Sequence, residues 1–161
     1  MNTPDTTPFV IRADEAEVIA GGSITLLSET GSAGSAIAVN RSFLPEGYSG
    51  VPPHFHERTT EMFFLLDGGL RALVGEQVLT LGPGDVLVVP AGVVHALAPA
   101  GGTHADFLAI ATPVTDRFDY YRLIDRVQAG AAKPQEILDT QERYDNRFVE
   151  SAAWNEARAA A

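Results

Sequence analysis

Short apolar runs separated by turn-forming residues dominate the middle of this chain. The runs are four to nine residues long, rich in valine, leucine and phenylalanine, and they end at clusters of glycine, proline or aspartate. Such runs are typical of β-strands. The expected strands are residues 36–44, 62–66, 70–74, 78–81, 86–89, 93–97 and 107–111. Short strands at this spacing indicate a sandwich or barrel rather than alternating strands and helices, and we expect an all-β fold built as a small double-stranded barrel.

The segment before these strands is less regular. Residues 9–27 mix apolar and acidic side chains and are expected to pair as edge strands, while residues 1–8 are polar and acidic and are expected to be disordered. In the strand at residues 36–44, Ile37, Val39 and Phe43 share one face.

After Pro113 the apolar spacing changes to three and four residues, which predicts helices. The apolar face of the first helix consists of Phe118, Tyr121, Ile124 and Val127. Its expected cap is Thr115 or Asp116, its expected end is Gly130, and Pro134 is expected to open a second helix. The predicted organisation is thus a barrel over residues 9–112, followed by C-terminal helices and a tail over residues 113–161 that pack on it.

The tail contains Phe148, Val149 and Trp154, which need a surface to cover. Two placements remain open for these C-terminal elements. They pack on the outside of the barrel or in a dimer contact, or they form a lid that excludes water from the barrel mouth.

Composition and charge narrow the function classes. The chain has 161 residues, 45% of them hydrophobic, which is enough for one domain with a proper core. It has 21 acidic and 11 basic residues, and this surplus of negative charge disfavours binding to nucleic acid or to anionic membranes. With no long apolar run and no visible secretory signal, the expected location is the cytoplasm. The expected ligand is small.

Three histidines and one glutamate stand at spacings that predict a metal site. His54 and His56 are two residues apart, so on a strand they share a face and can bind one ion. Glu61 follows after a polar stretch that must contain a turn or bulge. His95 comes after Pro90-Ala91-Gly92, and is therefore expected on a hairpin partner strand.

The donor set limits the choice of metal. Because the chain has no cysteine, only nitrogen and oxygen ligands are available, which excludes thiolate zinc sites and iron–sulfur clusters. One divalent transition-metal ion is expected: manganese, iron, cobalt or nickel, with zinc as a further candidate. A six-coordinate ion would keep two positions open for substrate, water or dioxygen. His104 lies outside this pattern and is expected to be an exposed loop residue.

These motifs resemble those of the cupin superfamily. Its two patterns, G-x5-H-x-H-x3/4-E-x6-G and G-x5-P-x-G-x2-H-x3-N, are matched here from residue 48 to Gly68 and from Gly84 to residue 99. Tyr48 replaces the first glycine and Pro99 replaces the final asparagine, and neither departure affects a ligand position. The resemblance implies a double-stranded β-helix, or jelly-roll barrel, with the metal inside it.

The expected walls of the site are apolar. Phe63 and Leu65 share strand parity with Glu61, and Leu97 shares it with His95, so these three are the predicted substrate-binding residues. Basic residues that could pair with an anion are scarce in the barrel segment. Arg58 lies in a polar connection, Arg71 is out of phase with its neighbours Leu70 and Ala72, and Arg41 is the remaining candidate. The inferred substrate is therefore neutral or weakly acidic, flat or apolar, and anchored chiefly by the metal.

Within the cupins, the chain resembles the bacterial quercetinase-like group of flavonol dioxygenases. The likeness rests on residues 52–58, on Glu61-Met62-Phe63-Phe64, and on the tail segment at residues 143–149. It implies a three-histidine, one-glutamate centre that binds the enolic hydroxyl of the substrate. Glu61 would be both ligand and general base, and the enolate would react with dioxygen, cleaving the heterocyclic ring and releasing carbon monoxide.

Two other classes of function remain open. A metal-dependent isomerase, epimerase or cyclase would use the same site without consuming oxygen, and a non-catalytic cupin would bind a small molecule without turnover. The native metal, the substrate and a role of Glu61 as ligand alone also stay open. A homodimer is expected, because it would cover the sheet edges and the C-terminal apolar residues.

Overall fold

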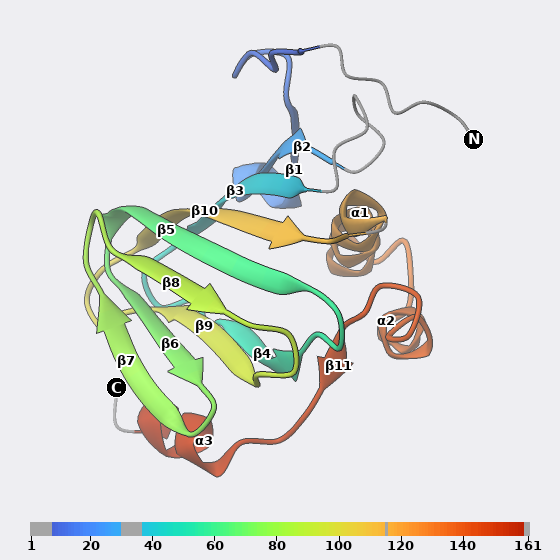
Figure 1. Cartoon of the computed structure of the whole chain (residues 1–161). Coiled ribbons are helices and arrows are strands. Elements are labelled where there is room, and N and C mark those ends of the chain that lie inside the picture. Colours follow the sequence, from blue (N-terminus) through green and yellow to red (C-terminus); the bar gives the residue numbers. More distant parts are fainter. Residues whose placement is uncertain (1–7, 30–36, 115, 160–161) are drawn as a thin grey trace.

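Two antiparallel sheets face each other and carry three helices (Figure 1). The computed structural model describes residues 8–29, 37–114 and 116–159. Ten strands form the main body: β1 (Glu17–Ile19), β2 (Ile24–Ser28), β3 (Ala38–Leu44), β4 (Val51–Phe55), β5 (Thr60–Gly68), β6 (Leu70–Val74), β7 (Gln77–Leu81), β8 (Val86–Val89), β9 (His95–Pro99) and β10 (Ala105–Thr112). The C-terminal part adds α1 (Arg117–Gln128), α2 (Pro134–Asp139), β11 (Arg147–Phe148) and α3 (Ala152–Ala159). The predicted all-β fold with a C-terminal helical extension is confirmed.

The strand order interleaves distant parts of the chain. One sheet has the order β1-β2-β3-β10-β5-β8 and the other has the order β11-β4-β9-β6-β7. A single turn of 3-10 helix (Ala20–Gly22) joins β1 to β2. Strands β4 and β9 are neighbours, although four strands lie between them in sequence, so the expectation that His95 sits on a hairpin partner is wrong in that detail. The antiparallel pairing itself places His54 directly opposite His95.

The core lies between the two sheets. Its fully buried centre includes Leu65, Leu70 and Ala72, with Phe63 and Phe107 beside them. Burial of this apolar surface supplies the main driving force for the fold. Phe43 of β3 and Ile37 just before this strand are exposed, and the buried positions of β3 include the small residues Ala38 and Ser42. The interior next to β3 therefore has room for a cavity.

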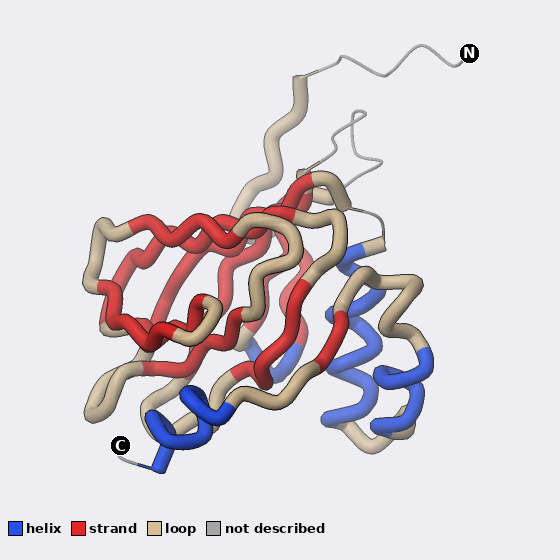
Figure 2. Tube along the Cα trace, turned by 60° about the horizontal axis from the view of Figure 1, so that its bottom comes forward, coloured by secondary structure: helices blue, strands red, loops and turns tan. Residues whose placement is uncertain are grey.

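The helices occupy two separate places (Figure 2). Helices α1 and α2 lie together at one end of the sheets, held by an apolar cluster around Tyr120, Leu123 and Tyr144. Helix α3 lies against the five-stranded sheet near β7, where Trp154 is fully buried against Leu73 and neighbouring alanines. The tail thus packs outside the sheets, whereas α1 and α2 cover one end of them.

Some predicted boundaries agree with the structure and others differ, such as those of β5 (Thr60–Gly68), which was expected at residues 62–66. Pro134 opens α2 at its first position, as expected. Residue 115 and residues 1–7 lie outside the described part of the chain, so a cap at Thr115 and a disordered N-terminus are untested, as is the division between residues 112 and 113. Strand β9 begins at His95 and not at residue 93, because the turn at Gly92 continues through a hydrogen bond from Val93 N–H to the Pro90 carbonyl. In the described residues, no helix is long and apolar enough to cross a membrane.

Candidate metal centre

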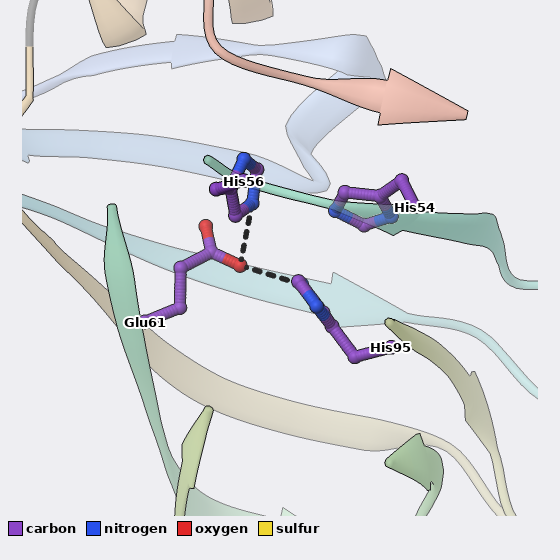
Figure 3. A group of neighbouring side chains, drawn as sticks. All are labelled: His54, His56, Glu61 and His95. Atoms are coloured by element: carbon purple, nitrogen blue, oxygen red, sulfur yellow. Dashed lines mark hydrogen bonds and ion pairs between the residues drawn. The ribbon is translucent and has the colours of Figure 1, made fainter. Parts of the chain in front are cut away.

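Three strands bring the predicted ligands together. His54 lies in β4 and His56 directly follows that strand, Glu61 is the second residue of β5, and His95 is the first residue of β9. Between His56 and Glu61 the chain turns from one sheet to the other, so the predicted interruption is present. Figure 3 shows the four side chains converging from these elements. We call these four residues the His/Glu group.

The geometry of the His/Glu group is that of a compact binding site. Each residue offers one ligand atom, and these atoms all lie within 4.8 Å of one another. All four side chains are buried. Glu61 Oε2 lies 2.9 Å from His95 Nε2 and 3.2 Å from His56 Nε2 (Figure 3).

Hydrogen bonds at the far side of each ring fix which nitrogen faces the centre. The Nδ1 atoms of His54, His56 and His95 donate to backbone carbonyl oxygens, at 2.8, 2.5 and 3.0 Å respectively. In a neutral imidazole the other nitrogen, Nε2, then carries a lone pair. Histidines that bind metals are oriented in this same way by a carbonyl or carboxylate behind the ring.

This arrangement fits a bound cation. With Nδ1 protonated, the Nε2 lone pairs of His56 and His95 face the ionised oxygen of Glu61, which is unfavourable without a proton or a cation between them. Among the described residues, His56 Nε2 is a buried nitrogen with no hydrogen-bond partner. A mixed set of imidazole nitrogens and one carboxylate suits divalent manganese, iron, cobalt, nickel or zinc.

Electrostatics favour the metal-binding protonation states of His54 and Glu61. Burial, followed by the neighbouring His95 and His56, holds the pKa of His54 well below its usual value. Burial alone would raise the pKa of Glu61, but the Arg117 guanidinium and the imidazole of His56 outweigh it, so the pKa lies well below the usual range. Neutral imidazole and ionised carboxylate are the ligand forms.

The C-terminal segment supports His56 from behind. The backbone carbonyl of Asp145 accepts the Nδ1 proton of His56, while its carboxylate accepts hydrogen bonds from the backbone N–H groups of Glu57, Arg58 and Thr59 and from the Thr59 hydroxyl. These bonds outweigh the effect of partial burial and lower the pKa of Asp145. The turn that follows His56 is therefore held in place by a residue 89 positions away.

Replacing Asp145 by alanine is expected to weaken both the fold and the metal site. The loss of its hydrogen bonds leaves partly buried N–H donors unpaired, which costs about 1–3 kcal/mol in the free energy of unfolding. Loosening the support of a ligand is expected to lower metal affinity about 10-fold or more. Urea unfolding and calorimetric titration with manganese measure the two effects.

Two variants control this prediction. Asp145→Asn is expected to cost less, because asparagine keeps one acceptor oxygen and tolerates the left-handed backbone at this position, where φ is 51°. Asp139→Ala removes an exposed carboxylate that accepts only from Gln135 on the same helix, and it is expected to change neither property. Unchanged metal affinity in Asp145→Ala would contradict a supporting role.

A match to a protein family covers this site. Residues 41–111 match the family model described as a cupin domain, and all four members of the His/Glu group lie in that span. This part of the chain, less than half of its length, is thus similar to cupin domains. Its motif glycine Gly68 has φ of 78°, and a Cβ there would lie 2.0 Å from the His104 carbonyl oxygen, so only glycine fits.

Solved structures share the fold of this region. KdgF from Halomonas sp. is similar with a TM-score of 0.59 and 17% identity, over 70% of this chain and 99% of that one. A protein with a double-stranded beta-helix domain from Klebsiella pneumoniae subsp. pneumoniae MGH 78578 gives 0.53 and 19%, over 66% and 91%. A cupin-like protein from Thermotoga maritima MSB8 gives 0.52 and 21%, over 56% and 68%. The predicted double-stranded β-helix is confirmed, and these likenesses extend to the fold alone.

One curated relative matches part of the chain. Oxidoreductase OpS7 of Beauveria bassiana (strain ARSEF 2860) is 38% identical over 71 residues, which covers 39% of this chain and 23% of that protein. The match thus spans less than a quarter of the relative's length.

A cavity of about 430 Å³ opens beside the candidate metal centre. His54 and Glu61 line it, so the cavity reaches the His/Glu group directly. Of the three predicted wall residues, Phe63 and Leu97 line the cavity, and their contact with substrate stays a prediction. Leu65 has the same inward parity as Glu61 and Phe63, but it lies farther along β5, fully buried in the core, and does not line the cavity.

The helices supply the other wall. Arg117 and the tyrosines Tyr120 and Tyr121 of α1 line the cavity, together with Asn146 and Phe148 of the following segment. The buried Arg117 guanidinium forms an ion pair with Glu61. It also lies over the rings of Tyr120 and Tyr121, with 5.8 and 5.4 Å between the guanidinium carbon and the ring centroids.

The expectation that basic groups are scarce near the site did not include Arg117, which lines the cavity. The three arginines considered for it do lie elsewhere: Arg41 pairs with Asp106, Arg58 is exposed, and Arg71 donates to the Ala157 carbonyl. Arg117 was missed because it begins a helix far from both motifs. A usable signal was its position next to the apolar face that starts at Phe118. His104, as expected, lies in a loop, where it pairs with exposed Asp67 and stacks on Phe43.

Proposed function

We propose that the cupin domain is a metal-dependent dioxygenase that cleaves an enolic aromatic or heterocyclic substrate, of the flavonol (quercetin 2,3-dioxygenase) type. The observation that carries this proposal is the His/Glu group at the inner end of a mostly apolar cavity of about 430 Å³. A cavity of this size and character suits a flat organic molecule. A small aromatic substrate and dioxygen are the proposed partners.

The ligand residues define what a metal would do there. His54, His56, Glu61 and His95 would hold one divalent ion, which when bound supplies a centre for binding the enolic hydroxyl and for chemistry with dioxygen. Manganese, iron, cobalt and nickel are the proposed ions.

Glu61 is the proposed catalytic base. It is the carboxylate that both belongs to the His/Glu group and borders the cavity, so it can reach a hydroxyl bound at the metal centre. One of its oxygens, Oε2, faces His56 and His95, while the other, Oε1, is paired with Arg117. To accept a proton, Glu61 has to loosen one of these contacts.

The cavity walls would bind and shield the substrate. Phe63, Phe107 and Phe148 present ring surfaces on which a flat molecule can pack. Helix α1 covers the side of the cavity away from the sheets and limits the access of water, which protects an enolate from reprotonation. This arrangement supports the lid interpretation for α1 and α2, while α3 packs elsewhere.

Two likenesses support an oxidoreductase. The curated relative that matches part of the chain is named an oxidoreductase. The motif residues around His54 and the tail segment at residues 143–149 resemble the quercetinase-like group, and in the structure Asp145, Asn146 and Phe148 of that tail all lie beside the site.

Oxygen uptake tests the proposal. Purified protein, stripped with chelator and reloaded separately with manganese, iron, cobalt or nickel, is incubated with quercetin under air and under nitrogen. The expected result is oxygen consumption and release of carbon monoxide with at least one metal, and neither under nitrogen. No oxygen uptake with any metal contradicts the flavonol assignment.

The nitrogen control separates the alternatives. Conversion of substrate without oxygen would indicate a metal-dependent isomerase or cyclase instead. Binding without conversion under either gas would indicate a non-catalytic binding protein.

A further inference from the structure

Arg117 is the feature of the cavity that the proposed ring cleavage does not use. Arg117 is 6% exposed and occupies the first position of α1, and its side chain lines the cavity. Burying a guanidinium is costly unless it is paired and hydrogen-bonded. A buried arginine at this position therefore needs a reason.

The partners of Arg117 leave part of its donor capacity unused. The guanidinium has five N–H donors. Its Nη2 pairs with Glu61, yet Nε is a buried donor with no hydrogen-bond partner among the described residues. The flanking rings of Tyr120 and Tyr121 hold the plane of the guanidinium in position.

The charges around the cavity do not balance once a metal is present. Among the described residues that line the cavity, Glu61 is the only carboxylate and Arg117 the only arginine or lysine. These two charges cancel, so the charge of a divalent ion held by neutral imidazoles would remain uncompensated in a mostly apolar space. An anionic ligand would reduce this excess of positive charge.

We propose that Arg117 binds an anionic group of the substrate, so that the cavity takes an aromatic or apolar molecule carrying a carboxylate or an enolate oxygen. This rests on the proposed function only in taking the cavity as the substrate site. Guanidinium groups bind carboxylates through two parallel N–H donors, and the unpaired Nε next to a terminal nitrogen provides such a pair. Glu61 Oε2 stays beside the imidazoles, and the incoming anion takes the place of Glu61 Oε1 beside the Arg117 guanidinium.

Binding of a matched pair of probes tests this assignment without turnover. The probes are 2-hydroxybenzoate and its neutral counterpart 2-hydroxybenzamide, titrated under nitrogen by calorimetry into metal-free and into zinc-loaded protein. We expect the carboxylate to bind the zinc-loaded protein at least about 10-fold more tightly than the amide, as for a charge-assisted pair of hydrogen bonds. Equal affinities would overturn the proposal.

Variants assign the preference to Arg117. Arg117→Met is expected to lose the preference for the carboxylate, and Arg117→Lys to keep only part of it, because lysine has no planar pair of donors. Arg122→Gln is the control, because Arg122 lies on the same helix but is exposed and pairs with Glu17 and Asp119. A preference that survives in Arg117→Met contradicts the proposal.

A second variant, expected to bind the carboxylate probe more tightly, tests the assignment independently of Arg117→Met. Glu61→Gln leaves the Arg117 guanidinium without its competing carboxylate, so in metal-free protein it is expected to bind 2-hydroxybenzoate about 10-fold more tightly than the native chain. Weaker or unchanged binding would count against the assignment. Because oxygen is excluded throughout, failure of the dioxygenase proposal leaves these results standing, and equal binding of both probes refutes Arg117 even if quercetin is cleaved.

Discussion

Replacing Glu61 by glutamine is expected to lower the rate of substrate turnover by about 10²–10⁴-fold, the range that a general base contributes. The amide keeps the shape of the side chain but cannot accept the hydroxyl proton. The imidazoles of His54, His56 and His95 remain, so metal binding is expected to weaken without being lost. Single-turnover kinetics and manganese titration on the same sample separate the two effects. Full turnover in Glu61→Gln would restrict Glu61 to the role of a ligand.

The same substitution should also destabilise the metal-free protein. Glu61 and Arg117 form a buried pair, with side chains 4% and 7% exposed, so glutamine leaves an uncompensated guanidinium. Removing one partner of a buried ion pair costs about 3–5 kcal/mol in the free energy of unfolding. Urea unfolding in the presence of chelator measures this cost.

A double variant shows whether the lost pair is the cause. Glu61→Gln combined with Arg117→Met removes both charges, and it is expected to regain most of the lost stability, because neutral side chains of similar volume often replace a buried ion pair at little cost. Arg122→Gln, which breaks exposed pairs on the same helix, is expected to cost at most about 1 kcal/mol. If the double variant is no more stable than Glu61→Gln, the pair does not explain the loss.

The second large effect concerns the metal itself. Manganese, cobalt, nickel or zinc at about 100 to 1,000 times its dissociation constant is expected to raise the free energy of unfolding by about 3–4 kcal/mol, because the ion binds the folded chain and not the unfolded one. The raised stability should disappear on addition of chelator. Thermal and urea unfolding with and without each metal measure it.

The fourth histidine of the chain is the natural control. His95→Ala removes a ligand and is expected to abolish most of the metal-dependent increase, whereas His104→Ala is expected to retain it, because His104 pairs with Asp67 in a loop outside the His/Glu group. Comparing each variant with and without metal cancels any direct effect of the substitution on the fold. An equal increase in both variants would contradict the assigned ligand set.

The homodimer and the finer substrate class stay predictions. The exposed valines Val78, Val86 and Val88 lie on edge strands β7 and β8, where a second copy is expected to pack. Nothing in the local pattern of these strands selects one partner over another.

The sequence by itself determined the candidate ligand set and the kind of fold. Side chains two apart share a strand face, and glycine and proline mark turns. Local spacing therefore predicts that His54 and His56 converge, that a turn precedes Glu61, and that His95 comes from another strand. The change from strand to helix periodicity near Pro113 is also a local pattern, so the sequence predicts it. Strand parity correctly turned Leu65 inward, but parity does not tell how far along the strand the cavity extends, and Leu65 lies in the core beyond it.

Only the tertiary structure decided how the site is supported and what its cavity contains. Asp145 reaches His56 across 89 residues, and Arg117 reaches Glu61 across 56. The direction of a helix relative to a sheet depends on packing between surfaces distant in sequence, so residue spacing does not predict that direction. The sequence thus predicted a metal in an apolar barrel, and the fold placed a buried arginine opposite that metal's only carboxylate ligand.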